Sequence, residues 1–457
     1  MKTESKIQIP KSKIGSLRTP HSALRTSYSD SLSYLYGLQK YGIKFGLSNI
    51  TRLLTSLGNP QKHLKTIHIG GTNGKGSVAS FIASALMKAG YKVGLYTSPH
   101  LVSFTERIRI NRREIPQERV IKLIERIRSQ AEKLKSITFF EFTTAMAFLY
   151  FAEEKVDIAI LEVGMGGRLD ATNVIYPLLS IVTNIALDHQ QYLGNTISKI
   201  AFEKAGIIKK RNILITAATQ PGVLHLFRKR CREFNTELFQ VGNHFKGIEK
   251  GPGVMDYQGR LWNLSRLTIG LAGPHQVTNA ATALGALEIL REKGYQIHET
   301  AIRQGFKDVQ WPGRLEVMRK KPLVILDGAH NPASMKTLKE SIRGRGESAA
   351  GGARPYFHYK RMILILGIMG DKDLRQIIKE IVPFAYKVIL TCPHLDRSAP
   401  PALLQKHAQR WCADIECIDD VKEAVSAAFS QAGKDDLVLI TGSLFTVGEA
   451  REFLDKQ

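Results

Sequence analysis

The sequence has no long uninterrupted apolar run. Its longest apolar stretch, Thr143 to Ala152, is followed by Glu153 and Glu154 and is far shorter than the roughly 20 residues that a helix needs to cross a bilayer. The N-terminus also lacks the apolar core of a secretory signal. We therefore expect no membrane span, no membrane partner and a cytoplasmic protein.

Cysteine is scarce as well. The four cysteines are Cys231, Cys392, Cys412 and Cys417, and their spacing matches neither a metal-binding nor a redox motif. A cysteine-ligated metal is therefore not expected, and the reducing cytoplasm fits this usage best.

Acidic residues are few in comparison with basic ones. Lys and Arg number 65 against 41 Asp and Glu, which gives a formal net charge of +24. Such an excess is typical of proteins that bind nucleic-acid phosphates. The basic residues are dispersed, however, and the sequence has no basic helix, no aromatic residues interleaved with arginine and no zinc-finger spacing. We expect a basic surface that attracts small anionic substrates, and no nucleic-acid partner.

Residues 1–30 are rich in Ser and Thr, carry six Lys or Arg and show little hydrophobic periodicity. This composition favours a flexible basic tail. A transit peptide is the alternative, but Glu4 and the lack of an amphipathic pattern weigh against it.

The rest of the chain predicts an α/β protein of two domains. With 457 residues, 43% hydrophobic and 23% charged, it exceeds what one core usually supports and has an ordinary globular composition. Apolar runs alternate with helical patterns, which predicts a mainly parallel sheet with helices on both faces. The expected strands form a first series and a second series: Thr66–Ile69, Lys92–Thr97, Val156–Leu161, Leu178–Thr183 and Asn212–Thr216, then Leu323–Leu326, Met362–Leu366, Lys387–Thr391 and Asp436–Thr441.

A Pro-Gly turn in Trp311-Pro-Gly-Arg314 separates the two series and is the predicted hinge. We expect the tail at 1–30, one domain at 31–311 and a smaller domain at 312–457. The stretch 344–354, rich in Gly, Ala and Arg, is predicted to be a surface loop of the second domain.

The most informative stretch is Thr66 to Ser80, where a β-branched run passes through four glycines into a helical pattern. Small residues let backbone N–H groups close around phosphate oxygens, Lys75 adds a positive charge, and Ser77 is placed to bind Mg²⁺ at a helix N-terminus. Phosphate chemistry is therefore the first hypothesis. The strict phosphate-loop pattern fails, because Gly76 separates Lys75 from Ser77 and His68 stands where the first glycine belongs. A glycine-rich turn without a ligand is the alternative.

Further polar residues follow the predicted strands. Glu162 ends an apolar run, at the sheet edge where open α/β proteins place ligands, and is a candidate Mg²⁺ ligand. Capping of the following glycine-rich turn is its structural alternative. His189 ends the run that starts at Val182 and is a second candidate, while Lys204, at an apolar helix start, would ordinarily form a salt bridge or extend toward water.

Taken together, these motifs resemble the folylpolyglutamate synthase and dihydrofolate synthase family of the Mur ligase superfamily, from about Gly42 to the C-terminus. The motifs that carry the resemblance are Gly71-Thr-Asn-Gly-Lys-Gly-Ser77, Leu161-Glu-Val-Gly-Met-Gly-Gly-Arg-Leu-Asp170, Leu187-Asp-His189, Glu203-Lys-Ala-Gly206, Pro312-Gly-Arg314 and Asp327-Gly-Ala-His-Asn-Pro332. This family uses the same irregular spacing around the lysine of the loop. The resemblance implies a Mur-ligase-like ATPase domain followed by a smaller Rossmann-like glutamate ligase domain that closes on it.

The resemblance also implies roles for individual residues. Lys75, Lys204 and His330 are the expected catalytic residues, with Lys204 carboxylated so that it offers an anionic oxygen to Mg²⁺. The phosphates are expected to contact Gly74, Lys75, Gly76 and Ser77, and the rest of the nucleotide Asn279, Arg314 and Asp327. A first Mg²⁺ is expected to bind Ser77 and Ser98, and a second Mg²⁺ Glu162, His189 and Lys204. The incoming glutamate is expected near His330 and Ser443.

The pterin side of the site is less clearly marked. Phe140, Glu141, Leu169, Asp170 and Ala171 match the positions that enclose dihydropteroate in the bifunctional enzymes. The aromatic residues of this region suit a core equally well. Two further alternatives stay open, since Arg314 suits a linker salt bridge and His330 suits a helix cap. The stretch 42–47 is an imperfect version of the family's pterin-contacting segment, so the choice of substrate is not fixed.

The expected reaction transfers the γ-phosphoryl group of ATP to a carboxylate of dihydropteroate or of a folate, after which the amine of L-glutamate attacks the acyl phosphate. The expected partners are these small molecules, with two Mg²⁺ ions, and the family's usual form is a monomer. A Mur-type enzyme for a UDP-sugar is disfavoured because only about 60 residues precede the loop. A switch ATPase, the other alternative, needs no paired Glu162 and His189.

Overall fold

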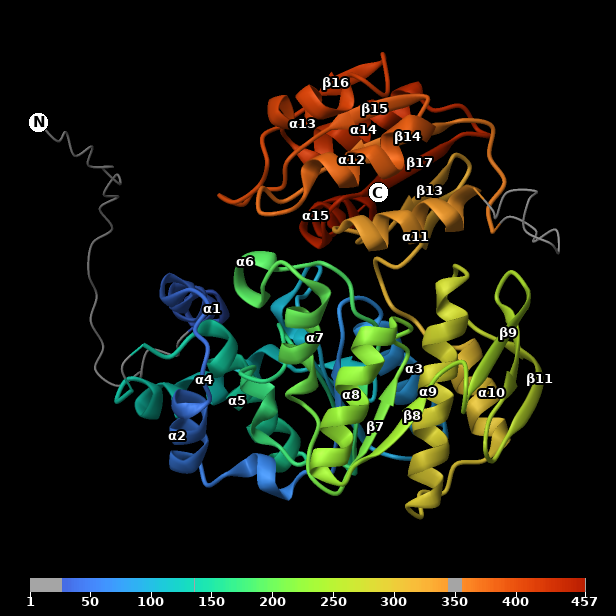
Figure 1. The fold of residues 1–457 in the computed structure, drawn as a ribbon. Coiled ribbons are helices and arrows are strands. Elements are labelled where there is room, and N and C mark those ends of the chain that lie inside the picture. The colour runs from blue at the N-terminus through green and yellow to red at the C-terminus, as the bar shows by residue number, and fades with distance from the viewer. Residues whose placement is uncertain (1–26, 135, 344–355, 457) are drawn as a thin grey trace, which may run out of the picture.

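The structure is a computed structural model that describes residues 27–134, 136–343 and 356–456. The predicted basic tail up to residue 26 and the predicted loop at 344–354 lie outside the described residues. Helix α1 (Tyr28–Gly37) begins within the predicted tail, because Ser27 and Asp30 form a capping box at its start. Figure 1 shows two layered bodies, one built from the first part of the chain (residues 27–312) and one from the second part (residues 313–456).

The first part contains a sheet of eight strands in the order β4-β3-β2-β5-β1-β6-β7-β8. All neighbouring pairs are parallel except β2 with β3 and β3 with β4. The strands are β1 (Thr66–Gly70), β2 (Val93–Tyr96), β3 (Ile108–Ile110), β4 (Arg113–Glu114), β5 (Ile158–Glu162), β6 (Leu179–Val182), β7 (Ile213–Thr216) and β8 (Glu237–Gln240). The first series of predicted strands is confirmed, whereas β3, β4 and β8 are short additions that the apolar pattern did not indicate.

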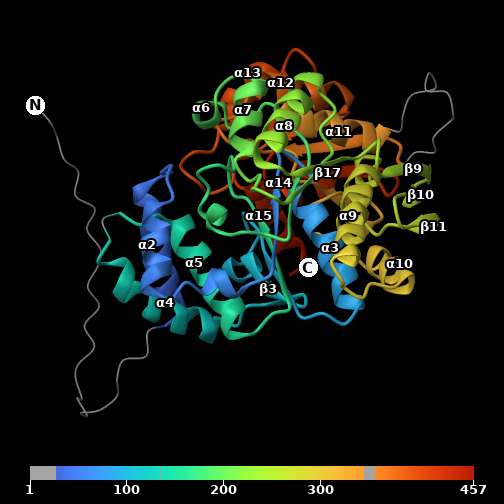
Figure 2. The ribbon, with the colours of Figure 1, turned by 60° about the horizontal axis from the view of Figure 1, so that its bottom comes forward.

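Helices cover both faces of this sheet, as predicted. Ile158 and Ile160 of β5 pack toward α3 (Lys75–Lys88) and α9 (His275–Glu292), whereas the alternate residues Ala159 and Leu161 pack toward α4 (Gln117–Ala131) and α5 (Phe139–Glu153). Figure 2 shows α9 and α10 (Glu299–Lys307) beside α3, away from α2 (Ser48–Ser56), α4 and α5. The remaining helices of this part are α6 (Gln190–Leu193), α7 (Ile197–Ala205) and α8 (Pro221–Phe234).

A separate antiparallel sheet of β9 (Lys246–Gly251), β10 (Val254–Gln258) and β11 (Asn263–Thr268) follows β8. Exposed residues alternate with half-buried ones along β9, while β10 and β11 mix buried residues with half-buried or exposed ones. The sequence did not predict it, because the search for strands relied on unbroken apolar runs, which mark strands buried on both faces.

The second part has a sheet of six strands in the order β12-β13-β17-β14-β15-β16, with β12 antiparallel at one edge. These strands are β12 (Glu316–Lys320), β13 (Leu323–Leu326), β14 (Met362–Leu366), β15 (Lys387–Leu390), β16 (Ile415–Cys417) and β17 (Leu437–Thr441). The helices are α11 (Pro332–Arg343), α12 (Leu374–Ile381), α13 (Pro401–Ala408), α14 (Val421–Gln431) and α15 (Leu444–Leu454), and they again form cores on two faces of the sheet. Within the described ranges, no helix has the length and apolar character that a membrane crossing requires.

Candidate functional site

The loop between β1 and α3 has the conformation that a phosphate cradle requires. Gly71 and Gly74 have φ of +136° and +84°, and Gly74 immediately precedes the first residue of α3. A Cβ at Gly71 would lie 1.9 Å from Oγ1 of Thr183, and a Cβ at Gly74 would lie 2.5 Å from Oδ1 of Asn279. Both positions therefore require glycine, and the loop leads directly into the N-terminus of a buried helix, where anions are favoured.

The residue that breaks the strict phosphate-loop pattern has a packing role. A Cβ at Gly76 would lie 2.6 Å from Cζ2 of Trp311, so the first turn of α3 packs directly against the linker between the two parts. The histidine at the other irregular position, His68, is fully buried in β1 and contacts Oγ1 of Thr172 at 2.8 Å through Nε2. Burial lowers the pKa of His68 to about 3, so the ring is neutral at neutral pH.

Glu162 is the last residue of β5 and faces the lysine of the loop. Its Oε1 lies 3.9 Å from Nζ of Lys75, which also donates a hydrogen bond to the carbonyl of Thr72. The backbone N–H of Ser98 donates to Glu162, at 3.3 Å. Burial raises the pKa of Glu162 and the Lys75 charge opposes this shift, so the carboxylate at this point favours a nearby cation. Ser77 lies in the first turn of α3 and is also buried.

The predicted placement of His189 at a strand end is wrong. Strand β6 ends at Val182, and His189 lies in the following loop, where it precedes α6 with φ of +50°. Burial lowers the pKa of its imidazole to about 4, although the neighbouring Asp188 opposes this shift. A neutral ring keeps the lone pair that a metal ligand needs.

The predicted position of Lys204 at a helix start is also wrong. Lys204 lies in the last turn of α7, is buried, and donates from Nζ to the carbonyl of Gly71 at 2.8 Å. It therefore does not extend toward water, and the described residues give it no salt bridge. Burial lowers its pKa to about 7, and the charge of Lys75 adds to this effect.

The predicted nucleotide-contacting residues come from three elements around the loop. Asn279 belongs to α9 and reaches Gly74, Arg314 donates from Nη1 to the carbonyl of Gly313 at 2.9 Å, and Asp327 follows β13. The carboxylate of Asp327 accepts the N–H groups of Leu315 and Ala329. Burial raises the pKa of Asp327, while the guanidinium of Arg314 lowers it. Within the described residues Arg314 forms no salt bridge of the kind that the alternative required, and its hydrogen bond goes to the carbonyl of the preceding residue.

His330 does not act as a helix cap. Its Nδ1 contacts the carbonyl of Gly328 at 2.8 Å and its Nε2 lies 3.5 Å from Oδ2 of Asp188, while the side chain of Asn331 accepts the N–H of Ser334 in the first turn of α11. Ser443, in contrast, is a cap, because its hydroxyl accepts the N–H of Thr446 at the start of α15.

The predicted pterin residues are divided between buried and half-buried positions. Phe140 is half-buried and stacks on Tyr96, with ring centroids 6.0 Å apart. Glu141 forms a capping box with Thr138 at the start of α5. Leu169 and Ala171 flank Asp170, which is buried and accepts N–H groups from Met165 and Thr172. The structure thus gives Glu141 a structural role that the sequence did not indicate.

Both parts of the chain match known protein families. Residues 69–287 match the Mur ligase middle domain, and residues 313–444 match the Mur ligase glutamate ligase domain. The dihydrofolate synthase/folylpolyglutamate synthase of Bacillus subtilis is 35% identical over 450 residues, which cover 94% of this chain and 99% of the relative. The chain belongs to the dihydrofolate synthase/folylpolyglutamate synthase family of Mur ligases.

Solved structures of this Mur ligase family have the same fold. Folylpolyglutamate synthase from Thermotoga maritima is 38% identical, with a TM-score of 0.80 and coverage of 94% of this chain and 96% of that chain. Escherichia coli FolC, solved in complex with DHPP and ADP, is 31% identical, with a TM-score of 0.82 and coverage of 96% and 99%. The predicted fold class and family are confirmed.

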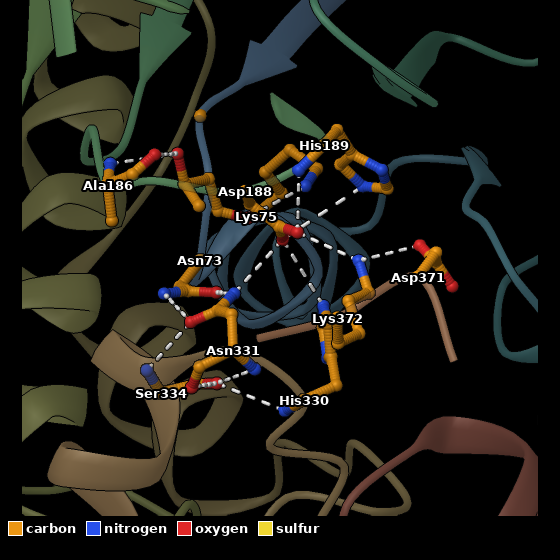
Figure 3. A network of polar contacts seen from close by, with 12 residues as sticks. Asn73, Lys75, Ala186, Asp188, His189, His330, Asn331, Ser334, Asp371 and Lys372 are labelled. Carbon is orange, nitrogen blue, oxygen red and sulfur yellow. Dashed lines mark hydrogen bonds and ion pairs between the residues drawn. The ribbon is translucent and has the colours of Figure 1, made fainter. Parts of the chain in front are cut away.

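The residues that connect the two parts of this Mur ligase were predicted only in part: His330 was an expected site residue, whereas Asp188, Asn331 and Lys372 were not. Figure 3 shows Lys372, His330 and Asn331 converging on Asp188 beside Lys75. Asp188 accepts from Nζ of Lys372 at 2.8 Å and from Nδ2 of Asn331 at 3.0 Å. Against the effect of burial, His330, His189 and Lys372 hold the pKa of Asp188 well below its usual range. The only feature of the sequence that pointed to Asp188 was its position next to the candidate ligand His189.

Proposed function

We propose that this Mur ligase joins L-glutamate to the carboxylate of dihydropteroate, to the γ-carboxylate of a reduced folate, or to both, and converts ATP to ADP and phosphate. The observation that supports this most strongly is the family membership along nearly the whole chain, together with a glycine-rich loop of the required shape. The ADP and DHPP bound to E. coli FolC are consistent with ATP and a pterin carboxylate as substrates.

In this reaction the γ-phosphoryl group of ATP passes to the substrate carboxylate. The carboxylate is a poor electrophile because of its charge, and the acyl phosphate removes that charge and provides a leaving group. The amine of glutamate then attacks the acyl carbon, and inorganic phosphate leaves. Lys75 and the N–H groups of the loop stabilise the phosphoryl oxygens by position and charge, so no protein nucleophile is needed.

The donor set beside the loop fits one Mg²⁺ ion. Ser77 offers a hydroxyl and Glu162 a buried carboxylate, both hard oxygen ligands, and Ser98 lies next to Glu162. When bound, the ion would neutralise negative charge on the phosphates. These three residues are our proposed ligands of the first site.

A second Mg²⁺ site needs a modified lysine. Within the described part of the chain, no three His, Cys, Asp or Glu side chains are grouped as a metal site. We propose that Lys204 reacts with CO₂ as its neutral amine, releasing a proton and forming a carbamate, and that this group joins Glu162 and His189. The lowered pKa of Lys204, about 7, supports the supply of neutral amine.

The remaining assignments are proposed on the same basis. Asn279, Arg314 and Asp327 would bind the nucleotide, His330 and Ser443 would lie near glutamate, and the pterin residues predicted from the sequence would enclose the acceptor. We also propose the domain boundary at 311/312, supported by the change of sheet there, and a monomeric cytoplasmic enzyme.

The proposal is tested with purified protein, ATP, Mg²⁺ and labelled glutamate, with dihydropteroate, dihydrofolate and tetrahydrofolate supplied in turn. A ligase releases ADP only when glutamate and an acceptor are present, and the label appears in the acceptor. Release of ADP without any need for glutamate would identify a switch ATPase and contradict the proposal.

A further inference from the structure

We infer that Asp188 is a positioning residue of this enzyme: its carboxylate holds His330 and Lys372 of the second part in a fixed place relative to the phosphate loop. This inference rests on the proposed function, because the ligase reaction is what the positioning serves. Asp188 belongs to the first part of the chain, and its principal partners belong to two different loops of the second part.

The contacts leave the carboxylate little freedom. Oδ1 accepts from Nζ of Lys372 at 2.8 Å and from the backbone N–H of His189 at 2.9 Å. Oδ2 accepts from Nδ2 of Asn331 at 3.0 Å and lies 3.5 Å from Nε2 of His330. Donors on both oxygens fix the carboxylate in one orientation, which makes it a template for the groups around it.

The pair is also largely removed from water. The exposed fraction is 6% for the side chain of Asp188 and 10% for that of Lys372, which also lies 3.7 Å from Asp371. Solvent-exposed ion pairs contribute little, but removing one partner of a buried pair leaves the other charge without compensation. The docking of the second part therefore depends on the charge of Asp188.

The loop that carries Asp188 is itself tied to the phosphate loop. Asn73 donates its N–H to Oδ1 of Asn184, and Ala186 donates its N–H to Oγ1 of Thr72. Asn331 bridges both regions, because its Nδ2 also donates to Oδ1 of Asn73 at 3.0 Å. Asp188 thus fixes the position of the second part relative to the phosphate loop.

His330 receives its orientation from the same arrangement. Its ring lies between the carbonyl of Gly328, at 2.8 Å from Nδ1, and the carboxylate of Asp188. Loss of the carboxylate would free one side of the ring and the ammonium of Lys372 together. The phosphate loop, which belongs to the first part, would keep its geometry, whereas Arg314 and Asp327 would move with the second part, so we expect a much larger effect on glutamate use than on nucleotide binding.

The experiment compares Asp188→Asn, Lys372→Met and the double variant with the full-length enzyme. The matched control is Asp414→Asn, which breaks a Lys–Asp pair of 3.0 Å with Lys387 inside the second part. We expect each single variant to lower kcat/KM for glutamate by about 100-fold, as misplacement by about 1 Å does, with a much smaller change in the Kd for ADP. We expect kcat/KM of the double variant to be no lower than that of the less active single variant, because both substitutions remove the same contact.

Three results would overturn the inference: unchanged kinetics for glutamate in Asp188→Asn, an equal loss of ADP affinity, or additive effects in the double variant. A second readout is independent of turnover. The radius of gyration from X-ray scattering, measured with ADP, should be larger for Asp188→Asn than for the wild type and for Asp414→Asn, and equal values would also overturn the inference. A wild-type enzyme without glutamate-dependent turnover would instead contradict the proposed function, and the scattering comparison would still decide the role of Asp188.

Discussion

At the scale of single residues, Lys75 has the position that phosphoryl transfer requires. It starts α3, and its ammonium lies between the carbonyl of Thr72 and the carboxylate of Glu162. We predict that Lys75→Ala abolishes glutamate-dependent ADP release, because the positive charge that stabilises the transferred phosphoryl group is lost. The melting temperature should change by only a few degrees. Turnover at the wild-type rate would remove the lysine from the mechanism.

Gly76 allows a second prediction at this scale. Because an added Cβ would meet the ring of Trp311 at 2.6 Å, Gly76→Ala should destabilise the protein by about 1–3 kcal/mol and displace the linker. Thermal unfolding and tryptophan fluorescence measure both effects. The control is Gly222→Ala in α8, where nothing lies within 4 Å of the added methyl group, and stability should stay the same or rise slightly. Equal behaviour of the two variants would show that the packing of Trp311 is not tight.

His68 gives a prediction about pH. Its pKa is about 3 in the folded protein and 6.5 in its ordinary state, so the unfolded chain binds the additional proton between these values. The contribution of His68 is complete above pH 6.5 and is lost as the pH falls toward 3, at up to about 1.4 kcal/mol per pH unit. His68→Gln should therefore show a shallower loss of stability from pH 6 to pH 4 in denaturant unfolding. A slope identical to that of the wild type would contradict the burial of a neutral ring.

At the scale of elements, the sequence indicated the strands that are mostly buried and missed those that are short or partly exposed. Strands β1 and β5 consist of buried residues along their length, and their largely apolar sequences predicted them as strands. Strand β9 alternates between exposed and half-buried residues. Lys204 was misplaced within α7 because its apolar neighbours are spread over the whole helix, although Thr196 before the helix and Gly206 after it are the residue types that mark a start and an end.

Helix α5 carries a prediction of its own. Thr138 and Glu141 form a capping box, so Thr138→Ala should lower the free energy of unfolding by about 1 kcal/mol. His298, which precedes α10 without a side-chain cap, provides the control, and His298→Ala should change stability little. If Thr138→Ala were as stable as this control, the carboxylate of Glu141 would be free for the predicted contact with substrate.

At the scale of the whole molecule, the contacts between the two parts could not be predicted. Asp188 meets Asn331 and Lys372, which lie 143 and 184 positions further along the chain. A local sequence pattern carries no information about these contacts, because the contacts arise where the two parts of the chain pack against each other. The motif residues could be predicted as a group because the family resemblance fixed their order, while their orientation depended on this long-range geometry.

The net charge of +24 leads to a prediction about the rate of binding. A field of one sign attracts anions before contact, and salt shortens its range from about 30 Å at 0.01 M to about 3 Å at 1 M. The association rate constant of ADP should therefore fall by about tenfold or more between 0.02 and 0.5 M NaCl, with a much smaller change in the dissociation rate constant. Stopped-flow measurements with a fluorescent ADP analogue separate the two constants, and a fluorescent adenosine analogue without phosphates is the matched control. Salt dependence carried by the dissociation rate alone would mean that the phosphate loop, and not the surface as a whole, determines how anions are attracted.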